Sequence, residues 1–538
     1  MVHRGGRGPA HRGAAQHFPT ERSRAVPDLL TRVAANAHRL ADAPAIDSPS
    51  EGRLTWGDLG VRMDELVAGF RARGRVPGEA IGIGVYRGTI GIQLYLAAQA
   101  AGLRPVLLGI GLGEHLVGAI RTAGITELFC GPELTGAPEA AAATGIPLFT
   151  VDGPAVLAQV SGTPDATRNW VERTDDEVSA IQYSTGTTGV PKGMVRSVGA
   201  DFWDAVNRNL CMRTRHSERW ICASPTNINV AIGALRCMIL MGGCIVALDE
   251  VSPETIELAS RDGVTILPLQ APGWRSLLAS GVADLLPERG LRVAVSTGQR
   301  TPGPIMDALG ALVGDRGEVV NSYGLTETST IATLTSSMPA YGADFVAGTP
   351  APLANVEVAP FSGAVADAGS RGEIRVRGVA VSPGYVLPTE EGQSNVGTAA
   401  DGWFYTGDVG DWNPDGTLSV LGRWKDALVV AGKYVFPYEL ETLVGNLPGV
   451  DEVVVLDDGH GLAVVVQPAA GAVIDAAAVR DAVAGRAPVV PSVSVIDIMP
   501  RNSSSKINRG DLRELLLAGS SRLSPLTDPE QSTVGAGA

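Results

Sequence analysis

The chain has 538 residues, of which 45% are hydrophobic and 19% are charged, as expected for a globular protein long enough to form more than one domain. Its formal net charge of −14 argues against a dedicated nucleic-acid or anionic-membrane surface, because such surfaces need clustered Lys and Arg. The expected partners are therefore small molecules or another protein.

The N-terminal residues 1–25 contain several arginines but no apolar segment behind them, so we expect a disordered tail and no secretory signal. Residues 519–538 are similarly polar and are expected to form a second disordered tail. The five cysteines include no CxxC pair and have no His at ligand spacing, which argues against a zinc site and a disulfide framework. We therefore expect reduced, buried thiols in a cytoplasmic protein.

Apolar runs alternate with helical patterns through the first three hundred residues. Residues 80–85 and 292–297 read as strands, whereas 89–102 reads as a helix, and this alternation predicts an α/β fold. The most apolar stretch, 228–248, has Arg236 at its middle and a Gly-Gly pair near its end. It is therefore interpreted as a buried helix followed by a buried strand and not as a membrane span.

A glycine-rich loop, YSTGTTGVPKG, occupies residues 183–193 between a predicted strand over 178–184 and a second one over 193–197. Glycines let backbone N–H groups approach a ligand, and hydroxyls with a lysine complete a site for phosphate oxygens. The spacing differs from that of a Walker A motif, and Pro191 lies beside the lysine. Taken alone, the loop could also be a hairpin without a ligand. The candidate phosphate-binding residues are Ser184, Thr185, Gly186, Thr187, Thr188 and Lys192.

Four further motifs follow the loop in order, namely NSYGLTETST (321–330), GWFYTGD (402–408), GRWKD (422–426) and PRNSSSKINR (500–509). Together with the loop they resemble the acyl-adenylate-forming superfamily, which includes acyl-CoA synthetases, nonribosomal-peptide adenylation domains and firefly-type luciferases. The resemblance covers about residues 30–515. Five motifs in the same order are specific to the superfamily but do not identify a substrate.

The resemblance implies roles for individual residues, and each role has a physical reason. Tyr323 offers a flat face for adenine, Thr326 a hydroxyl for the α-phosphate, and Glu327 a hard oxygen ligand for magnesium. Asp408 would accept hydrogen bonds from both ribose hydroxyls, and Arg423 would donate to the same sugar. Without the other motifs, the last two would read as surface charges at a turn. Gly298 and Ser322 complete the residues assigned to ATP.

Lys506 is implied to serve the first chemical step. Attack of a carboxylate on the α-phosphate brings two anions together, so a cation that contacts both lowers the barrier and aligns them. The family pattern has glycine before this lysine, whereas this chain has Ser505. If that position requires a positive φ, serine would strain it, and the loop would close differently or less often.

The acyl pocket is expected between the segment 225–234 and two glycines, Gly298 and Gly324. Many acyl-CoA-forming relatives carry a histidine after the proline that corresponds to Pro225, and amino-acid-activating relatives carry an aspartate in this region, but this chain has Asn227 and Asn229. These asparagines are either pocket donors or caps at a strand end. Without a carboxylate to pair with an ammonium, we expect a neutral, medium-sized carboxylic acid, aromatic or short aliphatic, to be preferred over amino acids and long fatty acids.

The resemblance also implies a domain organisation and an activity. We expect an α/β fold with a large N-terminal domain of layered sheets and helices, 26–424, and a small mobile α+β domain, 425–518. Lys425 matches the hinge, and Gly432 would line a tunnel for the pantetheine arm after the domain rotates.

The predicted activity is an AMP-forming acid–thiol ligase that uses ATP and Mg2+, with CoA or a phosphopantetheine group as the acceptor. The alternatives are an adenylating enzyme that loads an acyl-carrier protein or a nitrogen nucleophile, and an inactive homologue that binds ATP or acyl ligands. Retention of the phosphate-loop, magnesium, ribose and catalytic-lysine motifs argues against the inactive homologue.

Overall fold

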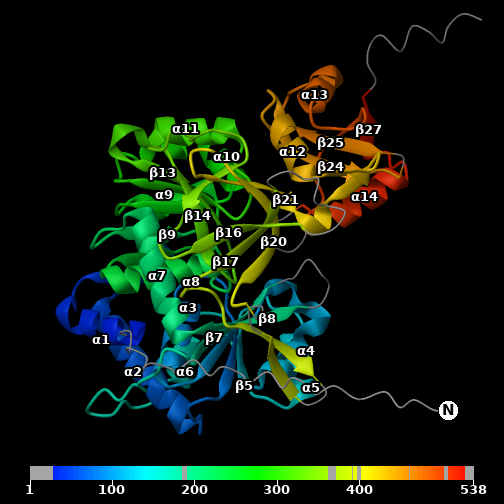
Figure 1. The fold of residues 1–538 in the computed structure, drawn as a ribbon. Coiled ribbons are helices and arrows are strands. Elements are labelled where there is room, and N and C mark those ends of the chain that lie inside the picture. Colours follow the sequence, from blue (N-terminus) through cyan, green and yellow to red (C-terminus); the bar gives the residue numbers. More distant parts are fainter. Residues whose placement is uncertain are drawn as a thin grey trace, which may run out of the picture.

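The computed structural model describes residues 28–184, 191–361, 371–389, 392–396, 401–459, 461–501 and 507–526. Within these residues, two large mixed sheets and their helices form the main body, and a small sheet with three helices follows near the C-terminus (Figure 1). The predicted α/β class is confirmed.

The first large sheet has the strand order β19-β18-β8-β7-β4-β3-β5-β6. The strands from β6 to β7 are parallel, and β7, β8, β18 and β19 are antiparallel neighbours. The predicted strand over 178–184 is confirmed as β7, and the glycine-rich loop connects it to β8. The bounds are β3 (Ala80–Gly84), β4 (Arg104–Leu107), β5 (Ile125–Cys130), β6 (Leu148–Thr150), β7 (Val178–Ser184), β8 (Lys192–Ser197), β18 (Gly384–Thr389) and β19 (Gly392–Val396).

The second large sheet has the order β16-β17-β20-β21-β15-β14-β13-β12-β11-β9-β10-β1-β2. It is parallel from β1 to β13 and antiparallel from β13 to β16, so β13 lies where the two patterns meet. The bounds are β1 (Pro44–Ser48), β2 (Gly52–Thr55), β9 (Arg219–Cys222), β10 (Cys244–Ala247), β11 (Ile266–Leu269), β12 (Val293–Thr297), β13 (Glu318–Leu325), β14 (Ser329–Thr335), β15 (Val346–Pro350), β16 (Asn355–Pro360), β17 (Gly372–Arg377), β20 (Phe404–Trp412) and β21 (Leu418–Arg423).

Helices pack between and outside these sheets. One core cluster contains Ile81 of the first sheet, Val320 of the second, and Leu94 and Ile232 from two helices, so those helices are sandwiched between the sheets. The bounds are α1 (Leu29–Arg39), α2 (Trp56–Ala72), α3 (Ile90–Ala100), α4 (Leu116–Ala123), α5 (Ala137–Thr144), α6 (Ala155–Val160), α7 (Val198–Met212), α8 (Asn229–Met241), α9 (Pro253–Ser260), α10 (Ala271–Ala279) and α11 (Gly303–Val313).

The apolar stretch 228–248 forms the predicted buried helix and strand, α8 and β10. Gly242 ends the helix with a φ of +65°, the left-handed conformation that favours glycine at a helix C-terminus. Arg236 is only 2% exposed but forms ion pairs with two aspartates of α7. Among the described helices, none is both long enough and apolar enough to cross a lipid bilayer.

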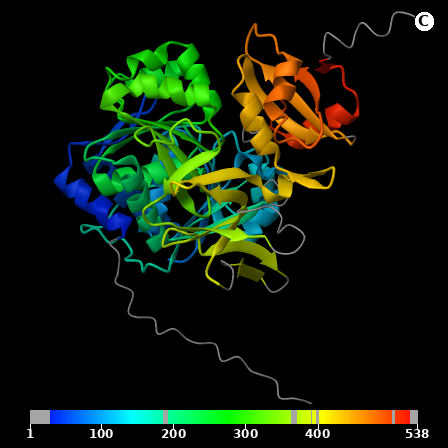
Figure 2. The same cartoon turned by 45° about the horizontal axis from the view of Figure 1, so that its top comes forward.

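The C-terminal part forms a separate lobe (Figure 2). Its sheet has the order β24-β25-β26-β27, with α12 and α13 packed in one core cluster and α14 in another. A short hairpin, β22 and β23, precedes it. The bounds are β22 (Leu428–Val430), β23 (Lys433–Val435), α12 (Pro437–Gly445), β24 (Val450–Asp457), β25 (Leu462–Pro468), α13 (Ala476–Val483), β26 (Ser492–Ile496), α14 (Arg509–Leu517) and β27 (Leu523–Pro525).

Regular structure extends beyond the predicted boundary at residue 518. Leu523–Pro525 forms β27, which pairs antiparallel with β26, and Leu523 is 8% exposed. The prediction of a tail over 519–538 is therefore wrong for its first residues. One apolar side chain and three ladder pairs keep this segment on the sheet although its composition is polar.

Polar contacts connect the lobe to the main body. Arg275 forms an ion pair with Asp451 and donates a 2.8 Å hydrogen bond to its carbonyl oxygen. Asn446 follows α12 directly: its Oδ1 accepts from Arg300 Nη2 at 2.9 Å, and its Nδ2 donates to Asp344 at 2.6 Å. Arg300 also donates to the carbonyl oxygen of Thr442 at 2.7 Å, so it satisfies a carbonyl in the last turn of α12.

Candidate active site

A cavity of about 340 Å3 lies between the main body and the C-terminal lobe. It is lined by the segment after β12, by β13, by β20 and β21, and by α12. The cavity therefore lies at β13, where the large sheet changes from parallel to antiparallel pairing. Arg509 of α14 also lines it. The structure brings six of the predicted site residues together on its wall, namely Gly298, Ser322, Tyr323, Gly324, Asp408 and Arg423.

The carboxylate predicted to bind ribose is fixed by two neighbours. The Tyr323 hydroxyl donates to Asp408 Oδ2 at 2.7 Å, and Arg423 Nε lies 3.1 Å from Oδ1. Asp408 and Arg423 are cross-strand partners in β20 and β21. Burial raises the pKa of the Asp408 carboxyl and that of the Tyr323 phenol, although Arg423 opposes the shift at Asp408. Each carboxylate oxygen keeps a second acceptor position for a ligand hydroxyl.

Glu327 lies in the turn between β13 and β14, beside Thr326, and both are half-buried. Its Oε1 accepts a 2.5 Å hydrogen bond from the hydroxyl of Tyr385 in β18. The Nζ of Lys192, at the start of β8, lies 5.6 Å from the centre of the same ring. Tyr385 therefore links the lysine of the glycine-rich loop to the carboxylate predicted to bind magnesium.

Tyr385 was missed by the sequence reasoning. It follows a Pro-Gly pair in VSPGYVLP, outside the five motifs, and nothing local marks it as a site residue. Burial raises the pKa of its phenol, so the hydroxyl remains a hydrogen-bond donor at neutral pH.

Some predicted residues lie outside the described part of the chain. These are Lys506 with its neighbour Ser505, and the loop residues Thr185, Gly186, Thr187 and Thr188. Ser184 ends β7 and pairs with Lys192 across the hairpin through its backbone. Arg509, three residues after Lys506 in the sequence, lines the cavity.

The two asparagines predicted for the acyl pocket are not among the residues that line the cavity. Asn229 is the first residue of α8, is 5% exposed, and accepts a 3.4 Å hydrogen bond from Arg236. The Asn227 carbonyl accepts from the Gln182 side chain, and its own Oδ1 is buried with no hydrogen-bond partner among the described residues. Neither side chain caps α8, whose N-cap residue is Ile228.

Lys425 and Gly432 lie on the connection to the lobe. Lys425 is exposed in a short 3-10 turn, Trp424–Asp426. Gly432 is at the exposed tip of the β22–β23 hairpin with a φ of +75°, and a Cβ added at this position would meet no heavy atom within 4 Å. In this arrangement of the lobe, Gly432 does not line the cavity.

The donor set around Glu327 fits a metal ion that arrives with phosphate groups. No group of three or more His, Cys, Asp or Glu side chains that could hold a metal occurs in the part of the chain that the structure describes. Mg2+ at nucleotide sites is bound by one or two carboxylates together with substrate phosphates and water. A single half-buried carboxylate, bonded to the tyrosine over whose ring Lys192 lies, is consistent with that arrangement.

Comparisons with known proteins agree with the geometry. The family model described as AMP-binding enzyme matches residues 33–386. Feruloyl-CoA synthase of Amycolatopsis sp is 30% identical over 484 residues, covering 86% of this chain and 93% of the relative. A 2-succinylbenzoate–CoA ligase of Geobacillus kaustophilus is 30% identical over 373 residues, covering 67% of this chain and 74% of the relative.

A solved structure has the same fold. It is the o-succinylbenzoate coenzyme A synthetase of Bacillus subtilis in complex with ATP and magnesium ion, with a TM-score of 0.75 and 23% identity, covering 90% of this chain and 98% of that one. The superfamily resemblance read from the five motifs is confirmed, and so is the predicted class of enzyme, an acyl-CoA synthetase-like ligase.

Proposed function

Because this chain belongs to the AMP-binding enzyme family, we propose that it activates a carboxylic acid with Mg2+ and ATP and transfers the acyl group to the thiol of CoA. The observation that carries the proposal is the shared cavity wall of Tyr323, Asp408 and Arg423, which suits a nucleoside. The names of the relatives, both of them CoA-linked synthases or ligases, support the acceptor.

In the first step, a carboxylate oxygen of the acid attacks the α-phosphorus of ATP. The new O–P bond forms as the bond to the bridging oxygen breaks, and pyrophosphate leaves with that electron pair. Lys506 and Lys192 are proposed to balance the negative charge, and Thr326 to donate to the α-phosphate. Glu327 is proposed to hold Mg2+, which would neutralise phosphate charge when bound.

In the second step, the thiol sulfur attacks the acyl carbon and loses its proton to solvent, and the bond between the acyl carbon and the AMP oxygen breaks, so that AMP leaves with that electron pair. We propose that the C-terminal lobe rotates about Lys425 between the steps and brings Gly432 into a tunnel for the pantetheine arm. The exposed position of Gly432 in the present arrangement, away from the cavity, is compatible with such a movement.

The proposed acid is neutral, of medium size, and aromatic or short aliphatic. Segment 225–234 carries no carboxylate that would pair with a substrate ammonium, and a buried unpaired ammonium costs several kcal/mol. The acyl groups named for the two relatives, feruloyl and 2-succinylbenzoyl, are aromatic, which supports an aromatic acid. The five cysteines are buried and unpaired, which supports the proposed cytoplasmic location.

Pyrophosphate release with a panel of acids tests the first step, and CoA or a phosphopantetheinylated carrier protein is then added to test the second. We expect release with an aromatic or short aliphatic acid and a thioester with CoA. If a thioester forms only on the carrier protein, or if an amide forms with an added amine, the acceptor is that protein or that amine and not CoA. No release with any acid would contradict an active enzyme, and a clear preference for a proteinogenic amino acid would show that the pocket has been misplaced.

Asp408→Asn and Asp415→Asn form a matched pair for the nucleotide site. Both aspartates belong to the β20–β21 hairpin, but Asp415 is exposed in its turn and does not line the cavity. We expect the KM for ATP to rise about tenfold for Asp408→Asn, on the scale of a lost hydrogen bond to a charged group, and to stay unchanged for Asp415→Asn.

A further inference from the structure

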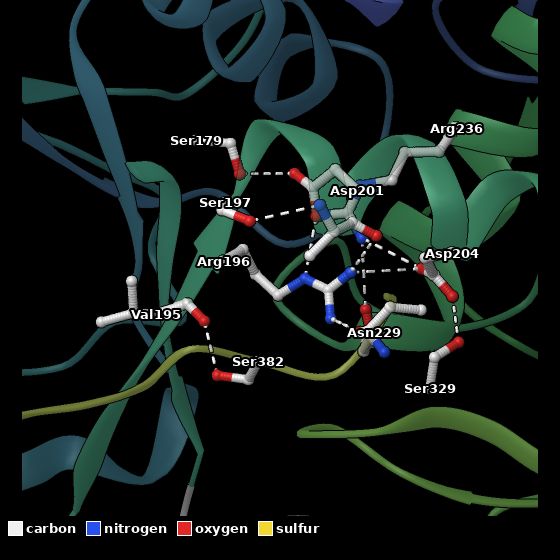
Figure 3. A network of polar contacts seen from close by, with 12 residues as sticks. Ser179, Val195, Arg196, Ser197, Asp201, Asp204, Asn229, Arg236, Ser329 and Ser382 are labelled. Atoms are coloured by element: carbon white, nitrogen blue, oxygen red, sulfur yellow. Dashed lines mark hydrogen bonds and ion pairs between the residues drawn. The ribbon is translucent and has the colours of Figure 1, made fainter. Parts of the chain in front are cut away.

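A cluster of charged side chains is buried between the two large sheets (Figure 3). Arg196 of β8 and Asp204 of α7 are 0% exposed, Arg236 of α8 is 2% exposed, and Asp201 of α7 is 3% exposed. Arg208 of α7 completes the cluster at its edge. The cluster therefore joins β8, which begins at Lys192, to the two helices that are packed behind the site.

Asp204 is the centre of the cluster. Its carboxylate oxygens lie 2.7 Å from Arg208 Nε, 3.2 Å from Arg236 Nη1 and 3.8 Å from Arg196 Nη2. Burial alone would raise the pKa of Asp204, but the three guanidinium groups outweigh burial and bring the pKa to about 2. The carboxylate is therefore ionised at every pH at which the enzyme would work. Replacing buried ion pairs by apolar groups is often neutral or stabilising, so stability alone does not explain this cluster.

Ser329 connects the cluster to the turn that carries Glu327. Its Oγ donates a hydrogen bond to Asp204 Oδ1, although the two residues are 125 positions apart. Ser329 follows the turn directly and has a φ of +62°, a left-handed conformation that is uncommon for residues other than glycine. The hydrogen bond to a buried carboxylate holds a serine in this conformation.

The strand opposite Ser329 shows how tightly the turn is built, since Ser329 pairs with Leu325 and the next pair is Gly324 with Thr330. A Cβ on Gly324 would lie 2.0 Å from the Ser329 carbonyl oxygen, so the two strands approach closely only because residue 324 is glycine. The ladder also shifts register between Tyr323 and Gly324. A change at Ser329 would therefore be transmitted to the strand that carries Tyr323.

A second set of contacts holds the other side of the turn. The Ser382 N–H donates to the Glu327 carbonyl oxygen at 2.7 Å, and the Ser382 hydroxyl donates to the Val195 carbonyl oxygen at 2.6 Å. Arg196 donates to the carbonyl oxygen of Ala380 at 3.2 Å. The two sides of the turn are thus tied to β8, which begins at Lys192, and to α7, which follows it directly.

We propose that Asp204 is a positioning residue that acts through Ser329 to hold the Glu327 turn at a fixed distance from Lys192, so that metal and phosphate groups meet both side chains at once. The inference rests on the proposed function, because it assigns Glu327 to the metal. In this proposal, the site depends on the buried carboxylate of Asp204, which contacts neither the substrate nor the metal.

The test compares Ser329→Ala and Ser329→Gly with Ser179→Ala as the matched control. Ser179 is also buried and also donates to a cluster aspartate, at 2.6 Å to Asp201, but it lies in β7 away from the turn. Ser329→Gly removes the hydroxyl without straining the backbone, whereas Ser329→Ala removes it and leaves the positive φ. Circular dichroism and thermal unfolding establish that each variant is folded.

Binding of Mn2+ to each full-length protein in complex with α,β-methylene-ATP is measured by electron paramagnetic resonance, which does not depend on turnover. We expect the Kd for Mn2+ to rise about tenfold for both Ser329 variants and to stay within about twofold of wild type for Ser179→Ala, since partners behind metal ligands affect affinity on that scale. In titrations of pyrophosphate release with Mg2+, the two Ser329 variants should likewise need more Mg2+ than wild type and Ser179→Ala.

Unchanged Mn2+ binding in both Ser329 variants would overturn the proposal. A loss confined to Ser329→Ala would also overturn it, since strain at a positive φ would then be the cause. An equal loss in Ser179→Ala would make the cluster a general structural element without a special link to the turn. Failure of wild type to release pyrophosphate with any acid is a separate result that contradicts the proposed function itself.

Discussion

The Tyr385 hydroxyl donates a 2.5 Å hydrogen bond to Oε1 of Glu327, across 58 positions of the chain. The two residues come from different sheets, since Tyr385 belongs to β18 and Glu327 follows β13. Lys192 lies over the same ring. One phenol therefore sets the orientation of a carboxylate and lies against the lysine of the glycine-rich loop, so its removal should affect metal and phosphate binding together.

Tyr385→Phe should raise the Mg2+ concentration needed for half-maximal pyrophosphate release by about tenfold, because Glu327 loses the donor that orients it. The fold should be retained, since the ring remains in place. Tyr405→Phe is the control: its hydroxyl also contacts a carboxylate, Asp401 at 3.0 Å, but it is 40% exposed and does not line the cavity. Equal magnesium dependence in the two variants would show that Tyr385 does not orient a metal ligand.

Lys506→Ala should reduce adenylation by roughly a hundredfold or more, the scale of one lost electrostatic contact in the transition state. Formation of thioester from supplied acyl-adenylate should be largely retained, because the charge serves only the first step. Pyrophosphate release and thioester formation are measured separately, with Arg522→Ala as a control for loss of a cation from the same lobe. A similar loss in both half-reactions would contradict the assignment of Lys506.

Local patterns were sufficient to predict several parts of this molecule. The alternating residues 178–184 form β7, and Arg236 with the Gly-Gly pair correctly indicated a helix and a strand in place of a membrane span. Short motifs also predicted residues that now share one cavity wall, among them Tyr323 and Asp408. Each of these features is determined by residues that are close together in the sequence or that belong to one short motif.

Other features depend on pairings between distant segments, and no local pattern encodes those. The bond between Ser329 and Asp204 spans 125 positions, and the contact of Asn229 with the buried guanidinium of Arg236 was not predicted from the sequence. Leu523–Pro525 was assigned to a tail because its neighbours are polar, although one leucine holds it on the sheet.

Gly432→Leu should leave pyrophosphate release nearly unchanged and block transfer to the thiol, so that acyl-adenylate accumulates. In the present arrangement of the lobe the new side chain would meet no heavy atom within 4 Å at its Cβ, and its bulk would matter only after rotation. Gly471→Leu is a close control, because Gly471 belongs to the same lobe, has a φ of +76° and is equally open. Normal transfer by Gly432→Leu would show that residue 432 does not line the thiol tunnel.

Asn446→Ala should weaken the contact between the lobe and the main body. Its side chain bonds to Arg300 and to Asp344, so its loss breaks both contacts at once. Since this arrangement places Arg509, close to Lys506 in sequence, at the cavity, we expect pyrophosphate release to fall several-fold, on the scale of one or two lost hydrogen bonds. Thioester formation from supplied adenylate should not fall.

The control for Asn446→Ala is Asn355→Ala, at an exposed position of β16. A fluorescence energy-transfer pair on the exposed residues Val61 and Val490 would report the position of the lobe directly. If Asn446→Ala leaves both the lobe position and the first half-reaction unchanged, these contacts do not stabilise the arrangement that serves adenylation.

Asp204→Asn should lower the free energy of unfolding by about 3–5 kcal/mol at neutral pH, because it leaves the buried guanidinium groups of Arg196 and Arg236 with one carboxylate and removes the partner of the partly buried Arg208. This loss should shrink in acid. The unfolded carboxyl has a pKa of 3.8 and the folded one about 2, so wild type must release a proton on folding between these values and loses stability as the pH falls from about 5 toward 2. Asparagine carries no such proton.

Calorimetry should therefore show that the difference in Tm between wild type and Asp204→Asn becomes smaller over that pH range. The exposed control Asp284→Asn should have the same Tm as wild type at each pH. A difference that stays constant with pH would mean that Asp204 is not ionised in the folded protein.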